Sequence, residues 1–338
     1  MMRKQAEAEI ETVQRLAAEL CWGAMKFSFT RFKDRTADKL YAASGWLSRQ
    51  STPVQNVGYG VLRALFWLIY YVPASHMRKT AIALHSAVGH SSPRQIYRDF
   101  VGGVLLFAKR IEMLSNGDTE PLDKLLKIPE QDRLDDIIKE HGGALLALPH
   151  CHGALLMVRG LASRYDTLML IREPRKDTRA EAQRRYFVNL GCEVLDVRRN
   201  NEAVVARTVL KALRNGKLVI GTVDRIKQPP PEAEPVSKER DNVRANAFGQ
   251  PVGVPGWPAR FAAKCKVPIL PVMVEQTEAD IVLHLGEPIV ATDVLSTTQK
   301  WLSALEKFFI RFPGQWIFVY DKHWSRLLRN RFNSSVEK

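Results

Sequence analysis

The stretch GGALLALPHCHGALLMVR, residues 142–159, places two histidines on a turn between an expected strand and an expected helix. Residues 144–148 form a short apolar run of the kind that fills a buried parallel strand, and Pro149 ends it. An apolar pattern with helical spacing then begins at Gly153. His150 and His152 are therefore expected at the carboxyl end of a strand, where open α/β sheets bind ligands. The alternative is that both are polar turn residues without a chemical role.

The chain that follows alternates between expected strands and helices joined by short loops. The strands are expected at residues 167–172, 192–197 and 218–223, and the helices at residues 177–190 and 201–214. This alternation predicts an α/β fold with a largely parallel sheet flanked by helices. A long loop, residues 228–256, is expected next, and it is a candidate substrate-side flap. Further on, we expect a helix from Pro258, strands at 267–274 and 281–285, a helix capped by Asp293, and a last strand at 315–320.

The sequence before this α/β part is expected to be helical. Residues 3–24 and 27–50 have amphipathic patterns, and Ser92 followed by Pro93 is a typical helix start. Residues 58–73 are apolar and rich in Trp and Tyr, but they are too short to span a bilayer. They are interpreted as an interfacial membrane segment, with a buried core helix as the alternative. The predicted organisation is an N-terminal helical, membrane-associating region (1–125), an α/β domain (126–325) and a basic tail (326–338).

The composition favours a polyanionic partner. The 338 residues include 50 Lys and Arg against 36 Asp and Glu, a formal net charge of +14. Such an excess is typical of proteins that bind nucleic acid or an anionic membrane, and no nucleic-acid reading motif is present. The four scattered cysteines form no CxxC pair, so neither a disulfide framework nor a structural zinc site is expected. The N-terminal residues lack the apolar run of a secretory signal, and none is expected.

Charged residues at other strand ends could join His150. Arg172 and Asp224 each follow an expected strand, and the carboxyl ends of parallel strands share one edge of the sheet. An imidazole can accept a proton from a hydroxyl group, while guanidinium groups hold phosphate or carboxylate. Arg175 lies just beyond Arg172, whereas Arg185 lies on a helix whose arginines could equally form a solvated face.

The pair His150-x-His152 is also similar to the metal-binding pair of amidohydrolases. That type of site needs further histidines after later strands, and only His284 and His323 follow. No metal is therefore expected.

Several stretches resemble the lysophospholipid acyltransferase superfamily, and within it the bacterial lipid A lauroyl/myristoyl acyltransferases. The matching stretches are ALLALPH (144–150), LIREP (170–174), RYFVNLG (185–191), LRNGKLVIGTVD (213–224), AFGQP (247–251), VPILPV (267–272) and FPGQW (312–316). The resemblance implies transfer of an acyl chain from a thioester, on acyl carrier protein or CoA, to a lipid hydroxyl, with no other cofactor. It also implies a peripheral or monotopic position on the cytoplasmic face of the bacterial inner membrane, with anionic lipid as a partner. Residues in or near the matching stretches are the candidate substrate-binding set, namely Arg172, Arg175, Arg185, Phe248, Gly249 and Pro271.

The sequence departs from the family at the catalytic motif, in which an acidic residue follows the histidine by five positions. Leu155 stands five positions after His150, and Met157 stands five after His152. Three explanations remain open. Asp224 could supply the carboxylate from another strand, the two histidines could act together with a different orienting group, or the protein could bind lipid without catalysis. The leading interpretation is an acyltransferase with His150, His152 and Asp224 as its catalytic candidates, and the alternative is a catalytically degenerate lipid-binding protein.

Overall fold

The computed structural model describes residues 45–47, 49–72, 74–175, 177–232 and 241–336. Its centre is a seven-stranded sheet with the order β1-β9-β8-β2-β5-β3-β4. Strands β8, β2, β5, β3 and β4 are parallel, whereas β9 runs antiparallel to β8. The largely parallel α/β sheet expected from the sequence is therefore confirmed. The strands are β1 (Leu126–Lys127), β2 (Ala144–Leu148), β3 (Thr167–Ile171), β4 (Glu193–Asp196), β5 (Leu218–Thr222), β8 (Ile269–Gln276) and β9 (Ile281–Leu285).

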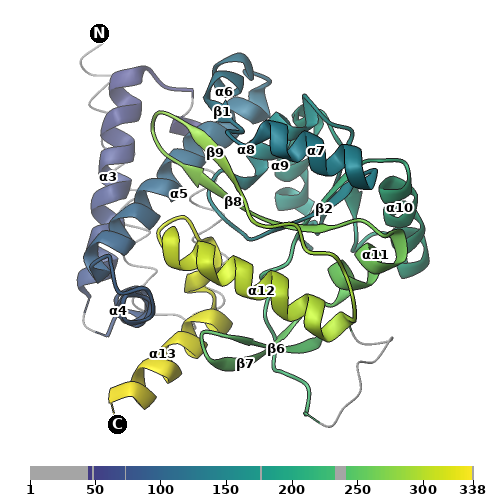
Figure 1. Cartoon of the computed structure of the whole chain (residues 1–338). Coiled ribbons are helices and arrows are strands. Elements are labelled where there is room, and N and C mark those ends of the chain that lie inside the picture. Colours follow the sequence, from purple (N-terminus) through teal and green to yellow (C-terminus); the bar gives the residue numbers. More distant parts are fainter. Residues whose placement is uncertain (1–44, 48, 73, 176, 233–240, 337–338) are drawn as a thin grey trace.

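Helices cover both faces of the sheet (Figure 1). Helix α8 packs against β3 and β8 on one face, and α5 lies outside it. Helices α10, α11 and α12 pack against β5, β2 and β8 on the other face. The helices of this part are α6 (Glu120–Leu125), α7 (Gln131–His141), α8 (Ala154–Ala162), α9 (Asp177–Phe187), α10 (Glu202–Arg214), α11 (Trp257–Cys265), α12 (Val294–Arg311) and α13 (Lys322–Val336), with a short 3-10 helix, η1 (Val188–Leu190), after α9.

Helices α3 (Thr52–Tyr71), α4 (His76–Val88) and α5 (Pro93–Asn116) precede this part in the described residues. The predicted start of α5 is confirmed, because Ser92 accepts a hydrogen bond from the Gln95 backbone and Pro93 is its first residue. Among the described residues, no single helix is long and apolar enough to cross a membrane. The pair α3 and α4 passes that test only together, with a bend of 76° between the two. The helices expected at 3–24 and over most of 27–50 fall outside the described residues.

The prediction of a loop at residues 228–256 is partly wrong, because this range contains a β-hairpin. Strands β6 (Val243–Ala247) and β7 (Gln250–Val254) pair antiparallel around a two-residue turn. That turn is Phe248-Gly249, and both residues have positive φ, 50° and 73°. Side chains of β6 are buried at alternate positions, against α12. This alternation within VRANA was the available signal, but small and polar residues made it weak.

The last strand expected at 315–320 is also wrong. Residues Ile317–Tyr320 form a second 3-10 helix, η2, and Trp316 makes only an isolated bridge with Cys151. The backbone here crosses the turn that carries the histidines: His152 N–H donates to Gln315 O, and Ile317 N–H donates to His150 O. The apolar residues that suggested a strand instead wall the site described below.

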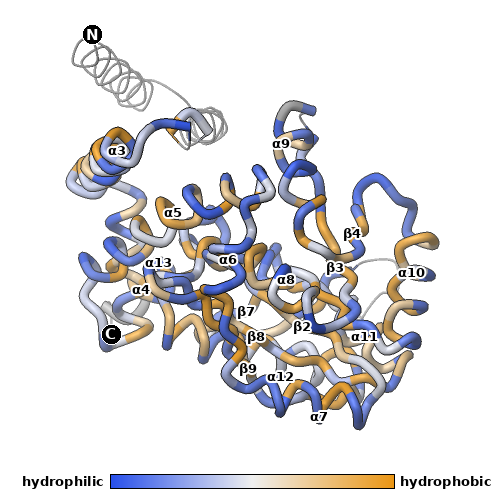
Figure 2. Tube along the Cα trace, turned by 90° about the horizontal axis from the view of Figure 1, so that it is seen from above, coloured by the Kyte–Doolittle hydropathy of each residue, from blue (hydrophilic) through white to orange (hydrophobic). Residues whose placement is uncertain are grey.

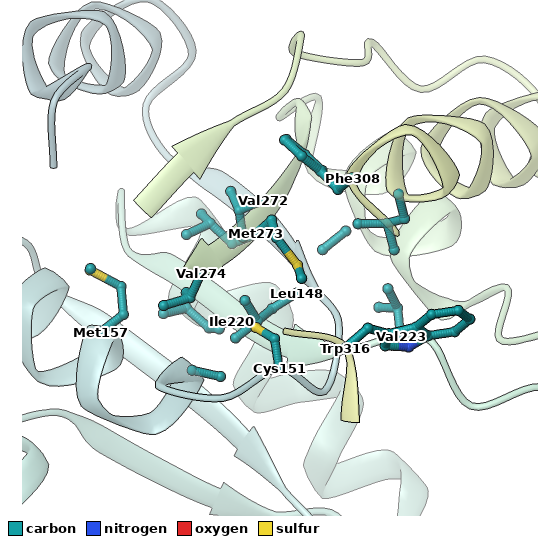
Figure 3. Close-up of a cluster of buried hydrophobic side chains, with 14 of the residues drawn as sticks. Leu148, Cys151, Met157, Ile220, Val223, Val272, Met273, Val274, Phe308 and Trp316 are labelled. Carbon is teal, nitrogen blue, oxygen red and sulfur yellow. The ribbon is translucent and has the colours of Figure 1, made fainter. Parts of the chain in front are cut away.

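The apolar strands lie inside the molecule and the polar residues outside (Figure 2). Beneath the histidine turn, Cys151 and Trp316 pack with side chains of β2, β5 and β8 (Figure 3). Helix α12 closes this core, and Asp293 caps it as predicted by accepting from the Ser296 backbone. Its buried residues include the expected apolar face, Trp301, Leu302, Leu305, Phe308 and Phe309.

Candidate active site

His150 and Asp224 form a hydrogen-bonded pair at the carboxyl edge of the sheet. Nδ1 of His150 lies 2.5 Å from Oδ1 of Asp224. Each residue follows the end of its own strand, β2 or β5, and these strands are neighbours in parallel register, with Leu148 opposite Thr222. The turn and strand end therefore bring together two side chains that lie 74 positions apart. Of the three explanations that the sequence left open, this geometry matches the one in which Asp224 supplies the carboxylate from another strand.

Two tryptophans hold the Asp224 carboxylate and its backbone. Nε1 of Trp316 donates to Oδ2 of Asp224 at 3.0 Å, and Nε1 of Trp324 donates to the Asp224 carbonyl oxygen at 2.6 Å. The side chain of Asp224 is fully buried. Burial of a carboxylate is costly unless its oxygens accept hydrogen bonds, and here both oxygens do. Asp224 is thus fixed in position from two sides.

The imidazole of His150 is half-buried, with 30% of the side chain exposed. One face of its ring stacks on Phe318, with 3.7 Å between centroids and 8° between planes. The guanidinium of Arg225 lies 5.7 Å from the centre of the same Phe318 ring. Phe318 therefore sets the plane of the imidazole, and Asp224 sets its rotation within that plane.

This arrangement suits a general base. A carboxylate on Nδ1 favours the tautomer that carries the proton there, which leaves the lone pair of Nε2 available. The carboxylate also stabilises the imidazolium that forms when Nε2 takes a proton. The pair therefore combines a histidine with a carboxylate, as the family's sequence motif does. The carboxylate follows β5 instead of lying in the helix after the histidine.

His152 has a different environment from His150. It is 1% exposed, its Nε2 has no hydrogen-bond partner among the described residues, and it packs against Phe100 and Gly103 of α5. Burial lowers the pKa of His152 to about 3, so the imidazole is neutral. The structure does not place His152 beside Asp224, and its role as a catalytic candidate stays a prediction.

Basic side chains gather at the adjoining strand ends. Arg172 follows β3, Arg198 follows β4, Arg225 follows β5, and all three are exposed. Partial desolvation at the protein surface lowers the pKa of Arg198, and nearby Arg172, Arg175 and Arg225 lower it further. Guanidinium groups that repel one another are typical of a site for a multiply charged anion.

A buried carboxylate supports this basic group. Glu173 is 6% exposed and pairs with Arg184 at 2.9 Å and Arg199 at 2.8 Å. Its backbone carbonyl accepts from Arg198. These partners hold the pKa of Glu173 below its usual range, chiefly through the hydrogen bond from Arg184. Glu173 thus anchors the loop on which Arg172 and Arg175 stand.

The other candidate substrate-binding residues lie elsewhere. Arg185 is exposed on α9, close enough to Glu112 of α5 to affect its pKa. Phe248 is buried against Trp316 and Trp324, and its backbone N–H donates to Glu306. Gly249 completes the β6–β7 turn, and Pro271 lies within β8 opposite Ala147. The structure does not bring these four residues to the His150 ring.

Sequence reasoning missed Trp316, Phe318 and Trp324. Trp316 ends the FPGQW stretch, and its indole nitrogen was the one available signal, because a buried tryptophan usually finds an acceptor. Phe318 and Trp324 carry no motif that distinguishes them from ordinary core residues. Among the described residues, no group of three or more His, Cys, Asp or Glu side chains is arranged to hold a metal ion.

Comparison with known families agrees with this geometry. Residues 91–325 match the family described as bacterial lipid A biosynthesis acyltransferase. The chain belongs to that family. It is therefore an acyltransferase, and the match includes both members of the His150–Asp224 pair and the residues that hold them. A comparison with individually curated proteins finds no significant match.

Proposed function

We propose that this acyltransferase moves a fatty acyl chain from a thioester, on acyl carrier protein or CoA, to a hydroxyl group of a lipid. The observation that carries the proposal is the 2.5 Å hydrogen bond between His150 and the buried Asp224. This hydrogen bond orients His150 as a general base, although this chain lacks the acidic residue of the family's sequence motif.

In the proposed reaction, Nε2 of His150 takes the proton of the acceptor hydroxyl as its oxygen attacks the thioester carbonyl carbon. Asp224 stabilises the resulting imidazolium. The tetrahedral intermediate collapses with cleavage of the C–S bond, and the imidazolium gives its proton to the leaving thiolate. The products are the ester and the free thiol of the carrier, so atoms and protons balance.

The basic group at Arg172, Arg198 and Arg225 favours a phosphorylated substrate. These residues follow strands next to or near the His150 strand, and Arg225 contacts the same Phe318 ring that His150 contacts. Acceptor lipids with phosphate groups and the phosphopantetheine arm of either donor carry the required charge. Arg172 and Arg175 are proposed as anion contacts on this ground.

The proposed location is the cytoplasmic face of the bacterial inner membrane, in peripheral or monotopic association. The supporting features are the exposed apolar residues Leu68 of α3 and Val72 just after it, and the net charge of +14.

The test is a transfer assay with the purified full chain, a lipid acceptor, and acyl carrier protein or CoA thioesters in parallel. His150→Ala should abolish transfer, whereas His141→Ala, a histidine on α7, should leave it unchanged. Full transfer by His150→Ala would rule out the proposed base. Vesicle binding without turnover on any thioester would instead favour a lipid-binding protein.

A further inference from the structure

A groove of about 1260 Å³ lies between α3 and α5. It is also lined by the end of β8 and the residues after it, 275–278, and by the end of α12 and the segment after it, residues 311–315. Neither His150 nor Asp224 lines it. Helix α5 separates the two sites, since its Gly103 contacts the buried His152 ring. The groove is therefore distinct from the His150–Asp224 pair.

The groove carries an excess of positive charge. Its lining includes three acidic residues, Asp99, Glu275 and Glu278, and six basic ones, Arg63, Arg94, Arg98, Lys109, Arg110 and Arg311. Two of the carboxylates already accept hydrogen bonds, Asp99 from Gln95 and Glu275 from His284. None of the six basic side chains forms an ion pair with a carboxylate in the described part of the chain. Burial lowers the pKa of Arg110, and the charges of Glu278 and Asp280 act on Arg110 to oppose that shift. The lining still has twice as many basic as acidic residues, which favours an anionic occupant.

Arg110 gives the groove a buried cation whose hydrogen bonds are incomplete. Arg110 is 4% exposed, and its Nη2 donates to the backbone carbonyl of Glu278 at 2.9 Å. Its Nη1 is buried and has no acceptor among the described residues. A buried charged donor without an acceptor is costly, and an anion in the groove would offset that cost.

The rim of the groove is suited to a membrane surface. Trp67 of α3 lines it, and Arg94 of α5 lies 5.5 Å from the centre of the Trp67 ring. Leu68 and Tyr71 of the same helix, and Val72 just after it, are each more than half exposed. Tryptophan and tyrosine beside exposed aliphatic residues are typical of helices that lie at the headgroup level of a bilayer.

We propose that the α3–α5 groove binds the phosphate headgroup of an anionic phospholipid and holds the protein on the membrane independently of catalysis. Arg94 and Arg98, one helical turn apart on the exposed side of α5, contact the phosphate. Lys109 and the buried Arg110 lie about 16 Å further along the helix and add to the positive potential of the groove. The aliphatic residues of α3 enter the bilayer beside the bound headgroup. The test below measures membrane binding only. A negative result would therefore overturn the headgroup site without bearing on the proposed acyl transfer.

The test is flotation of the full chain with vesicles of phosphatidylcholine, with and without phosphatidylglycerol. The groove variant replaces Arg94, Arg98 and Lys109 together by Gln. One basic residue near an anionic surface contributes about 1 kcal/mol, so the loss of three should weaken binding to the anionic vesicles at least about ten-fold. Binding to vesicles of phosphatidylcholine alone should change little.

A control with the same charge loss replaces Arg207, Lys211 and Lys264 by Gln. These exposed residues lie on α10 and α11, outside the groove. The control should keep wild-type binding to anionic vesicles. Equal loss in both variants would show that net charge alone attracts the protein, and no loss in the groove variant would also overturn the proposal.

Arg110→Gln examines the buried cation without changing an exposed side chain. It should weaken anionic binding several-fold while its circular dichroism matches that of the wild type. Arg110→Lys, which keeps the charge, should recover part of the binding. If Arg110→Gln does not fold, the exposed triple variant still decides the outcome.

Two competition measurements identify the source of the phosphate. Inorganic phosphate, at ionic strength matched with chloride, should not displace the protein from anionic vesicles, whereas soluble glycerophosphoglycerol should compete. Displacement by inorganic phosphate alone would assign the groove to a free anion and overturn the lipid as occupant. Loss of acyl carrier protein binding in the groove variant, with vesicle binding intact, would overturn it as well.

Discussion

Nδ1 of His150 lies 2.5 Å from Oδ1 of Asp224, although 74 positions separate the two residues in the chain. Parallel pairing of β2 with β5 makes this possible, because both strands end at the same edge of the sheet. The position five residues after His150 is Leu155, whose side chain has no carboxylate. The carboxylate therefore comes from a distant position in the chain, yet it forms a direct hydrogen bond with the imidazole.

Asp224→Asn should lower kcat about 10³- to 10⁴-fold, because an amide neither favours the reactive tautomer nor stabilises the imidazolium. The folded structure should persist, since Asn can still accept the hydrogen bond from Trp316. The measurement is steady-state transfer alongside thermal unfolding. A variant that folds and keeps wild-type kcat would show that Asp224 does not assist His150.

Trp316→Phe should lower kcat about ten-fold, because a hydrogen bond to the Asp224 carboxylate is lost and such a bond contributes about 1.5–3 kcal/mol. The matched control is Trp301→Phe. Trp301 is also fully buried, but its Nε1 has no partner among the described residues. Both variants should lose stability from the smaller ring, and only Trp316→Phe should lose activity. Equal activity losses would point to core packing rather than to the carboxylate.

Gly103→Ala should destabilise the fold by about 1–3 kcal/mol, because overpacking of a core forces side chains or backbone to shift. A Cβ at this position would lie 2.3 Å from Cδ2 of His152. Gly102→Ala on the same helix meets no atom within 4 Å and should stabilise by up to about 1 kcal/mol. Urea unfolding of both variants measures the difference, and the same sign for both would contradict the packing described here.

The pKa of His152, which burial lowers to about 3, predicts a pH dependence of stability. The unfolded chain binds a proton at His152 below about pH 6.5, and the folded chain does not do so until about pH 3. Stability is therefore fully present above about pH 6.5 and falls as the pH is lowered through this window, by at most about 1.4 kcal/mol per pH unit.

His152→Gln removes that titration. The free energy of unfolding of this variant, measured in urea across the same pH range, should fall less steeply than that of the wild type. Carboxylates contribute equally to both slopes and cancel in the difference. Identical slopes would mean that His152 is protonated in the folded protein.

The sheet could be predicted because its strands are short apolar runs separated by turn residues. The run at 144–148 and the run ending before Asp224 have that form, and their order predicts parallel strands whose ends meet. The pattern of strands thus indicated that His150 and Asp224 could lie close together. The N-caps at Ser92 and Asp293 followed from local chemistry of the same kind.

The hairpin and the walls of the site could not be predicted for a different reason. The turn at Phe248-Gly249 places a bulky residue at positive φ, a conformation that sequence patterns rarely indicate. Residues 315–320 have the apolar content of a strand, but tertiary contacts with His150 and His152 fix them as a bridge followed by a 3-10 helix. Long-range contacts, rather than local preference, determine the conformation of both segments.

The placement of Trp316, Phe318 and Trp324 has a consequence for synthesis on the ribosome. These residues fix Asp224 and the His150 ring, yet they follow every strand of the sheet in the chain. A nascent chain can therefore pair all seven strands before its reactive centre exists. The contacts that hold Asp224 and the His150 ring form only after residues 316–324 have left the exit tunnel and packed against them.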